Sequence, residues 1–280
     1  MGMFRYTTRT FARELVLLAI AAVWWIPFYF LVTISLKSDS EVYTQSAGAL
    51  PTTLAWGNYS TAWKGSGGLS LGNAMVNSLV ITAGSVLILV AIGSMTAYAV
   101  ARHRGKLGTV LYLMFVLGII IPFQLGLIPT FVVLRHLHLN TSYFGMILLY
   151  TGILMPLSVF LFTGFVRTLP RDYEEAAYID GASRFLTFTR VVFPLLRPIA
   201  ATVALLSAVL IWNDFFIQLV FLAGSPRQTV VVAIYAFVGE YATNWNLVFA
   251  TVILSIAPIM IFYIFAQRRL VRGFTGGIKT

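Results

Sequence analysis

Long apolar runs separated by short polar segments dominate the pattern along this chain. The run Leu15–Leu36 is 22 residues long and carries no charge. A helix needs about 20 apolar residues to cross the roughly 30 Å hydrocarbon core of a bilayer. Six runs reach that length, and we expect one membrane-spanning helix in each: 15–36, 74–101, 107–134, 143–166, 199–222 and 247–266. The pattern therefore predicts an all-α integral membrane protein.

The first run has features of both a signal peptide and a retained span. It follows Arg5, Arg9 and Arg13, as a signal peptide would. Its apolar part is 22 residues long, whereas the apolar region of a signal peptide has about 7–15. We interpret it as a retained first span.

Composition agrees with this pattern. Hydrophobic residues make up 59% of the chain and charged residues 10%, whereas soluble domains are about 45–50% apolar and about 25% charged. The chain has no cysteine, which excludes disulfides and thiol chemistry. A net charge of +10 could indicate nucleic acid. In a membrane protein it reflects the Lys and Arg that flank the spans, so we expect lipid and not nucleic acid around this chain.

The basic residues also predict the orientation. With the N-terminus inside, 15 of the 19 Lys and Arg fall in inner segments and 4 in outer ones. By the positive-inside rule both termini are then cytoplasmic. We expect a cytoplasmic N-terminus over 1–14, a six-span domain over 15–266 and a cytoplasmic tail over 267–280.

Two segments interrupt this regular pattern. The span 107–134 contains Pro122 and Pro129, and proline inside a helix kinks it. Such a kink is either purely structural or forms the wall of a translocation path lined by water. The outer stretch QTVVVAIYAFV, 228–238, is too short to span, which indicates an interfacial or re-entrant piece.

The inner segment RDYEEAAYIDGASRF, 171–185, concentrates negative charge. It holds four of the nine acidic residues of the chain: Asp172, Glu174, Glu175 and Asp180. Asp172 with Glu175 resembles a capping box that starts a helix, and Gly181 is suited to end it. Ser183 is placed to cap a second helix that runs toward Pro194. We expect a helix–turn–helix at the cytoplasmic surface.

The acidity of this segment bears on what it contacts. The cytoplasmic leaflet is anionic and attracts basic residues, so an acidic helix there indicates a protein partner. An ordinary solvated connector is the alternative.

The sequence offers little for catalysis. Gly105-Lys106 lacks the remainder of a phosphate-binding loop. The three histidines, His103, His136 and His138, do not have the spacing of a metal site. We therefore predict no enzyme activity, no catalytic residue, no metal and no cofactor in this chain.

One acidic residue lies inside an expected span. Asp214 follows Trp212 and Asn213, and an ionisable residue within a span marks a functional site by default. Asn213 and Asp214 either face a wet cavity and bond a polar solute, or they bond a neighbouring helix, or Asp214 is protonated. Transporters driven by a proton or sodium gradient usually carry ionisable residues inside their spans, and here Asp214 is the one such residue.

Several stretches resemble one known family. EEAAYIDGASRFLTFTRVVFPLLRP resembles the EAA loop of ATP-binding-cassette importer permeases. NYSTAW, NSLVIT, TAYAVARHRGK, IPFQLGLIPTF, WNDFFIQLVFL and AQRRLVRGFTGGIKT are similar to its carbohydrate-uptake members, such as the six-span maltose-system permease. The resemblance covers nearly the whole chain.

The resemblance implies roles for particular residues. A coupling helix in the loop 167–197, between spans four and five, would dock on an ATPase subunit through Glu174, Glu175, Ala176, Ala177, Asp180 and Gly181. The tail residues Gly273, Gly276, Gly277 and Lys279 would contact the ATPase, and Trp212, Asn213 and Asp214 would lie near the translocation path. Tyr178 departs from the family pattern, which often has a basic residue there.

The implied function is that of a permease subunit in the bacterial inner membrane, importing a carbohydrate or related polar solute. Its implied partners are a second permease subunit in a heterodimer, two ATPase subunits that bind ATP and Mg, and an extracytoplasmic solute-binding protein. The alternative is a secondary transporter or channel that acts alone.

Overall fold

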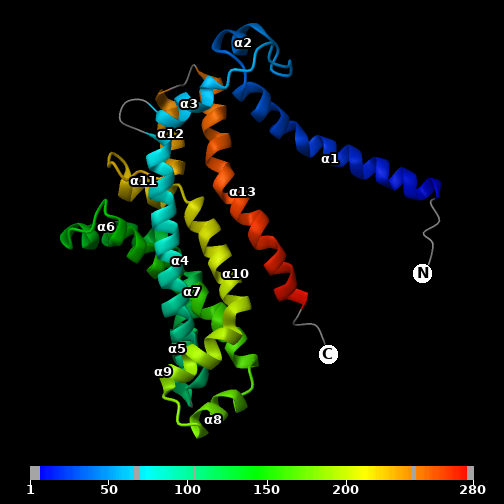
Figure 1. The fold of residues 1–280 in the computed structure, drawn as a ribbon. Helices are drawn as coiled ribbons and strands as arrows, with labels where there is room; N and C mark the ends of the chain where they lie inside the picture. Colours follow the sequence, from blue (N-terminus) through cyan, green and yellow to red (C-terminus); the bar gives the residue numbers. More distant parts are fainter. Residues whose placement is uncertain (1–6, 66–69, 104, 241–243, 276–280) are drawn as a thin grey trace. The chain divides into compact units, whose positions relative to one another are not determined.

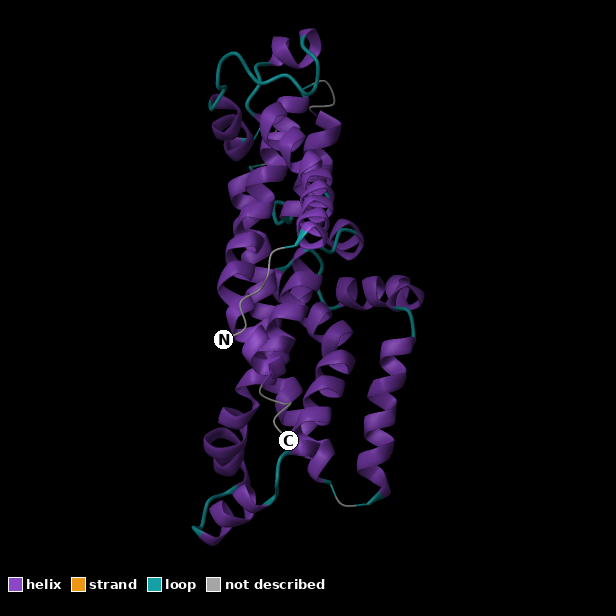
Figure 2. Cartoon of the chain, turned by 90° about the vertical axis from the view of Figure 1, so that its right-hand side faces the viewer, coloured by secondary structure: helices purple, strands orange, loops and turns teal. Residues whose placement is uncertain are grey.

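A computed structural model describes residues 7–65, 70–103, 105–240 and 244–275 of the chain. Regular structure in these ranges is helical throughout, with no strand among them (Figure 2). The chain divides into two compact units, Met1–Gly72 with Ala233–Ile256, and Asn73–Val232 with Ala257–Thr280. The predicted all-α architecture of an integral membrane protein is confirmed.

Within the described ranges, four helices are long and apolar enough to cross a membrane. They cover Thr10–Ser35, Leu71–Arg102, Tyr143–Thr168 and Arg184–Trp212. A bent pair, Lys106–Ile120 with Phe123–His136, makes a fifth if it is counted as one span, and Trp245–Ile261 is a shorter apolar helix. Six spans with both termini inside stay a prediction.

The first unit contains α1 (Thr8–Ser35), α2 (Asp39–Thr44), α3 (Gly57–Lys64) and parts of α12 (Val230–Glu240) and α13 (Trp245–Thr275). α1 begins at a capping box in which Thr7 and Thr10 each bond the backbone of the other. The helix α12 coincides with the stretch expected to be interfacial or re-entrant.

Polar side chains hold the segment between α1 and α3 in a fixed fold. The Asn58 amide donates to the carbonyl oxygens of Ser35 (2.8 Å) and Lys37 (2.9 Å). The Lys37 side chain is fully buried and its ammonium donates to the Ser46 carbonyl at 2.8 Å. Backbone groups that would otherwise lack partners are thereby satisfied.

Glu41 also stabilises the segment between α1 and α3. Its carboxylate accepts hydrogen bonds from the backbone N–H groups of Ser38 and Thr52, both at 2.9 Å, and from their hydroxyls. The Thr52 hydroxyl, followed by the backbone donors, lowers the pKa of Glu41 to about 2. Donors to the charged form stabilise that form.

The lowered pKa of Glu41 predicts how this segment responds to acid. An unfolded glutamate titrates near pH ~4.3, so the stabilisation is fully present above that value and is lost as the pH falls through the folded pKa of about 2. We expect digestion of residues 38–56 by pepsin to increase steeply over this window. Glu41→Gln should digest readily at every pH tested, and equal digestion of both proteins would contradict the assignment.

The second unit is built on three long helices, α4 (Leu71–Arg102), α7 (Tyr143–Thr168) and α10 (Phe193–Trp212) (Figure 1). A buried apolar core joins them and includes Leu89 of α4, Phe162 of α7 and Leu196 of α10. A second core, around Ile81, Tyr150 and Phe221, joins α4 and α7 to α11 (Phe216–Leu222). These helices position the two sites described below.

The segment expected as one kinked span is broken into two helices. α5 (Lys106–Ile120) ends before Pro122, a short 3-10 turn follows (Phe123–Gly126), and α6 (Leu127–His136) leaves at 90°. Pro122 breaks the helix because it has no N–H to donate. Pro129 is accommodated because it lies in the first turn of α6, where N–H groups have no partner within the helix.

The helix α5 packs against α7. The Tyr112 ring stacks on Phe160, with ring centroids 6.3 Å apart. The Arg167 guanidinium lies 4.5 Å from the centre of the same Tyr112 ring, a cation–π contact. The break at Pro122 therefore redirects α6 while α5 stays fixed to the core of the unit.

The apolar run 199–222 is also not a single helix. α10 ends at Trp212 and α11 begins at Phe216. The Asn213 amide donates to the Val209 carbonyl at 2.8 Å, and the Asp214 carboxylate accepts from the Ile217 N–H at 3.3 Å. Short polar side chains compete with the helix for backbone groups, which ends α10 and starts α11.

Candidate functional site

The acidic segment folds as a helix, a tight turn and a second helix. α8 (Asp172–Ile179) ends in a turn where Gly181 has a φ of +82°. The Gly181 N–H donates to the Tyr178 carbonyl at 3.0 Å and the Ala182 N–H to the Ala177 carbonyl at 2.9 Å. These are the two bonds of a Schellman motif, so the prediction that Gly181 ends this helix is confirmed.

The start of α8 differs from the expectation. The capping box predicted from Asp172 and Glu175 does not form, because Arg171 occupies the cap position in a helical conformation and no side chain caps it. Asp172, Glu174 and Glu175 instead share the first turn, where the helix dipole favours negative charge.

The chain continues from the turn into a long apolar helix without a break. The Ser183 hydroxyl accepts from the Leu186 N–H at 3.3 Å and caps α9 (Arg184–Thr187), as predicted. A five-residue π-helical turn, Phe188–Val192, then joins α9 to α10. Arg184–Trp212 is consequently one continuous helical stretch of 29 residues.

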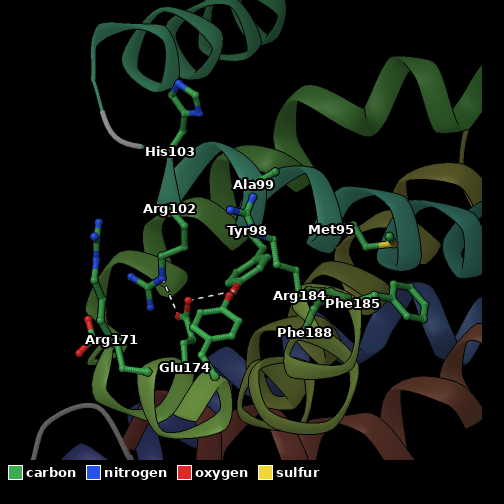
Figure 3. Close-up of a pocket in the computed structure, with 12 residues that line it drawn as sticks. Met95, Tyr98, Ala99, Arg102, His103, Arg171, Glu174, Arg184, Phe185 and Phe188 are labelled. Carbon is green, nitrogen blue, oxygen red and sulfur yellow. Dashed lines mark hydrogen bonds and ion pairs between the residues drawn. The ribbon is translucent and has the colours of Figure 1, made fainter. Parts of the chain in front are cut away.

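One side of α8 is fixed to the end of α4 (Figure 3). Glu174 is buried, and one of its carboxylate oxygens lies 2.7 Å from Nε of Arg102. Its other oxygen accepts from the Tyr98 hydroxyl at 2.8 Å. Tyr98 and Arg102 are four residues apart on α4, on one face of the helix. We call Tyr98, Arg102 and Glu174 the α4–α8 clamp.

Two further contacts extend the clamp. Nη2 of Arg102 donates to the carbonyl of Leu169, the residue that ends α7, at 2.9 Å. The hydroxyls of Tyr98 and Tyr178 lie 3.4 Å apart. Tyr178, where a basic residue was expected from the family pattern, thus adds a hydroxyl to this cluster. The clamp lines a cavity of about 830 Å³ between α4, α8 and α9.

The other side of α8 is exposed. Ile179 is 86% exposed and Tyr173 53%. Of the residues predicted to dock on an ATPase, Glu175, Ala176, Asp180 and Gly181 are exposed, Ala177 is half-buried, and Glu174 faces inward to the clamp. We call Tyr173, Glu175, Ala176, Ile179, Asp180 and Gly181 the outer face of α8. Tyr173 and Ile179 therefore give the outer face of α8 two large side chains that are open to solvent.

A second polar cluster lies at the break between α10 and α11. The Tyr150 hydroxyl of α7 donates to the Asp214 carboxylate at 2.7 Å. Tyr150, Asn213 and Asp214 line a cavity of about 400 Å³ whose other walls are apolar. Asp214 therefore bonds a neighbouring helix, which was one of the predicted alternatives, and it also borders a cavity.

Trp212 does not join this cluster. It is buried and lines a separate, apolar cavity of about 390 Å³ together with residues of α4, including Leu79 and Val86. Of the three residues predicted near the translocation path, the structure brings two together. Sequence reasoning missed Tyr150, which completes the pair with Asp214.

The predicted tail residues are described in part. Gly273 lies in α13, whereas Gly276, Gly277 and Lys279 lie outside the described residues. Among the described residues, no group of three or more His, Asp or Glu is placed to hold a metal ion.

Comparison with protein families gives one match. The family of binding-protein-dependent transport system inner membrane components matches residues 89–276. This range includes the α4–α8 clamp, the outer face of α8 and the Tyr150–Asp214 pair.

Individual relatives extend the likeness over most of the chain. The melibiose/raffinose/stachyose import permease protein MelC of Bacillus subtilis is 36% identical over 259 residues, 92% of each chain. A probable starch degradation products transport system permease protein, AmyC of Thermoanaerobacterium thermosulfurigenes, is 35% identical over 260 residues, 93% of each chain.

A solved structure shares the fold. A chain of a bacterial ABC transporter involved in the import of the acidic polysaccharide alginate superimposes with a TM-score of 0.80. The superposition covers 96% of this chain and 99% of that chain, at 23% sequence identity.

Proposed function

Because the chain belongs to the family of binding-protein-dependent transport system inner membrane components, we propose that it is the permease subunit of an ATP-binding-cassette importer that carries a carbohydrate into the cytoplasm. The observation that carries this proposal is the match of 36% and 35% identity to sugar permeases along more than nine-tenths of the chain. The chain resides in the bacterial inner membrane, as its family does.

The proposed arrangement has six spans with both termini in the cytoplasm. The distribution of basic residues supports this orientation, and it places α8 and α9 on the cytoplasmic side. The broken segment Lys106–His136 forms one span in this arrangement, and α13 forms the sixth. A second permease subunit completes the translocation path, and a solute-binding protein delivers the solute from outside.

The outer face of α8 is the proposed docking surface for an ATPase subunit. It combines an exposed apolar anchor, Ile179, with small residues, Ala176 and Gly181, that allow a close approach. A few well-packed residues usually carry most of the energy of a protein interface. Glu174 serves the same surface indirectly, because it holds α8 on α4. The tail residues Gly273, Gly276, Gly277 and Lys279 are proposed as a second contact with the ATPase.

The chemistry of ATP belongs to the partner subunits in this proposal. They bind ATP and Mg, and this chain supplies no catalytic residue. Closure of the ATPase pair displaces α8, and the helices that carry it switch between inward- and outward-facing states. Such a switch requires that ATP and solute each favour one of the two states.

Reconstitution tests the function directly. Liposomes that contain this chain, its permease partner and the ATPase subunits should accumulate a carbohydrate when the binding protein and ATP are supplied. The same chain without the ATPase should accumulate none, with or without an ion gradient. Uptake by the chain alone, driven by a proton or sodium gradient, would instead establish the secondary transporter.

The Tyr150–Asp214 pair provides a test of the translocation path. A hydrogen bond contributes about 1 kcal/mol, which corresponds to about a fivefold change in affinity. We expect Tyr150→Phe and Asp214→Asn each to raise the solute concentration at half-maximal uptake by about that factor.

Tyr143, which lies on α7 like Tyr150, provides a matched control. The Tyr143 hydroxyl donates to Asn77 at 2.6 Å, away from the cavity beside Asp214. Tyr143→Phe loses a similar bond and should leave the half-maximal concentration unchanged. An equal effect of both Tyr→Phe changes would show that the Tyr150–Asp214 bond only stabilises the fold.

A further inference from the structure

Arg102 joins three elements through one side chain. It belongs to the last turn of α4, its Nε pairs with Glu174 of α8 at 2.7 Å, and its Nη2 bonds the Leu169 carbonyl at the end of α7 at 2.9 Å. The side chains of Arg102 and Glu174 are only 14% and 9% exposed. One largely buried side chain therefore connects α8 with the ends of α4 and α7.

The pair is arranged as a strong and selective contact. Hydrogen bonds between charged partners are about twice as strong as neutral ones. Both oxygens of Glu174 are engaged, one by Arg102 and the other by Tyr98. Loss of either charged partner leaves the other buried without compensation. The charge of Arg102 is neutralised inside this chain, so the adjoining cavity offers no free Arg102 charge to an anionic ligand.

The connection from α8 to α10 differs from the clamp because it runs along the chain itself. It passes through α9 and the π-helical turn Phe188–Val192. The contact of this turn with α4 is apolar, with the rings of Phe188 and Tyr98 centred 5.4 Å apart. A π-helical turn within a helix is rare and often marks a functional site. This contact is made by side-chain rings, whereas the clamp is made by hydrogen bonds to charged groups.

We propose that the α4–α8 clamp stays closed through the transport cycle and makes α4 and α8 move as one body, while the turn Phe188–Val192 absorbs the change of angle between α8 and α10. Arg102, Glu174 and Tyr98 are positioning residues in this mechanism. The inference rests on the proposed docking of α8 on an ATPase subunit. It assigns to α4 the direct mechanical connection with the ATP cycle.

The first experiment separates coupling from folding in the reconstituted transporter. Glu174→Gln keeps the shape of the side chain but removes its charge. We expect assembly with the ATPase subunits and ATP hydrolysis to persist, while the number of ATP molecules hydrolysed per solute imported rises at least about fivefold, the lower range of typical coupling effects. Arg102→Lys should behave similarly, because lysine cannot reach Glu174 and Leu169 together in the fork geometry of arginine.

Asp172→Asn is the matched control. It makes the same change of acid to amide on the same helix, at an exposed position in the first turn. It should leave the ratio of ATP to solute unchanged. An unchanged ratio in Glu174→Gln, or a parallel loss of uptake and hydrolysis through failed assembly, would show that the clamp has a structural role only and would overturn the proposal.

The second experiment tests whether the clamp stays closed. The chain has no cysteine, so Arg102→Cys with Glu174→Cys introduces a unique pair in this subunit. A bismaleimide that bridges this pair should lower the ATP-to-solute ratio toward that of the unaltered transporter. If bridging instead stops import that the unbridged double variant supports, the clamp must open during the cycle and the proposal is wrong.

The proposed function and the clamp mechanism give different experimental outcomes if they are wrong. If the unaltered chain neither binds an ATPase subunit nor imports solute with it, the proposed function fails. If it does both and Glu174→Gln transports with an unchanged ATP-to-solute ratio, only the clamp mechanism fails.

Discussion

Replacement of Ile179 by aspartate is expected to abolish ATP-driven import by preventing the ATPase from docking. Ile179 is 86% exposed and sits at the end of α8 beside the Gly181 turn. Truncation of an interface hot spot costs about 2 kcal/mol or more, and a buried unpaired carboxylate adds a desolvation penalty. We expect the dissociation constant for the ATPase subunit to rise about 100-fold or more, measured by co-purification and by titration in detergent.

The matched controls distinguish docking from misfolding. Ile179→Leu preserves an apolar side chain of equal size and should bind the ATPase normally. Asp172→Asn changes an exposed charge at the opposite end of α8 and should also bind normally. If Ile179→Asp retains wild-type affinity in an intact complex, the outer face of α8 is not the docking surface.

Gly181→Val is expected to reduce import at least about tenfold, because the turn after α8 requires a left-handed residue. Gly181 has a φ of +82°, and an L-residue in the left-handed region costs roughly 1–2 kcal/mol, with β-branched residues worst. No neighbouring atom lies within 4 Å of a Cβ placed there, so the cost is conformational and not steric. Relief of the strain would break the bonds to Ala177 and Tyr178 and turn the outer face of α8 away.

A graded series tests this cause. Gly181→Asn should retain most import, because asparagine tolerates the left-handed region, and Gly181→Ala should fall between asparagine and valine. The measurement is ATP-dependent uptake at equal amounts of assembled transporter. A series that follows side-chain volume, with asparagine as damaging as valine, would instead indicate a clash with the docked ATPase.

The local features of the acidic segment 171–185 were predictable because they depend on neighbours in the sequence. Gly181 and Ser183 end one helix and begin the next through bonds to residues at most five positions away. The capping box was mispredicted because Arg171 already has helical geometry. Several residue types can occupy a helix start, whereas a left-handed turn strongly favours glycine.

The clamp was not predictable by periodicity, because its partners are 72 and 76 residues apart in the chain. A signal was nevertheless present. Tyr98 and Arg102 lie four residues apart on the last turns of a helix in which Arg102 is the one charged residue. Such a pair needs a polar partner nearby, and Glu174 in the acidic segment supplies it.

The effects of the two prolines in the span 107–134 could not be predicted from the sequence pattern alone. Both were expected to kink one helix, yet Pro122 breaks it and Pro129 fits into the helix that follows. A proline removes a donor wherever it occurs, and the effect depends on whether the helix needs that donor. Once Pro122 ends α5, a new first turn begins, and Pro129 falls where no donor is needed.

α1 has a consequence for the biosynthesis of the protein. It has 28 residues, and its most apolar stretch has a mean hydropathy of 2.4. Its backbone polar groups are satisfied within the helix, as a bilayer requires. α1 can therefore leave the ribosome, enter the lipid and become stable while later residues are still being translated. α8 depends instead on residues that are translated before it, because the polar partners that hold it in place are supplied by α4.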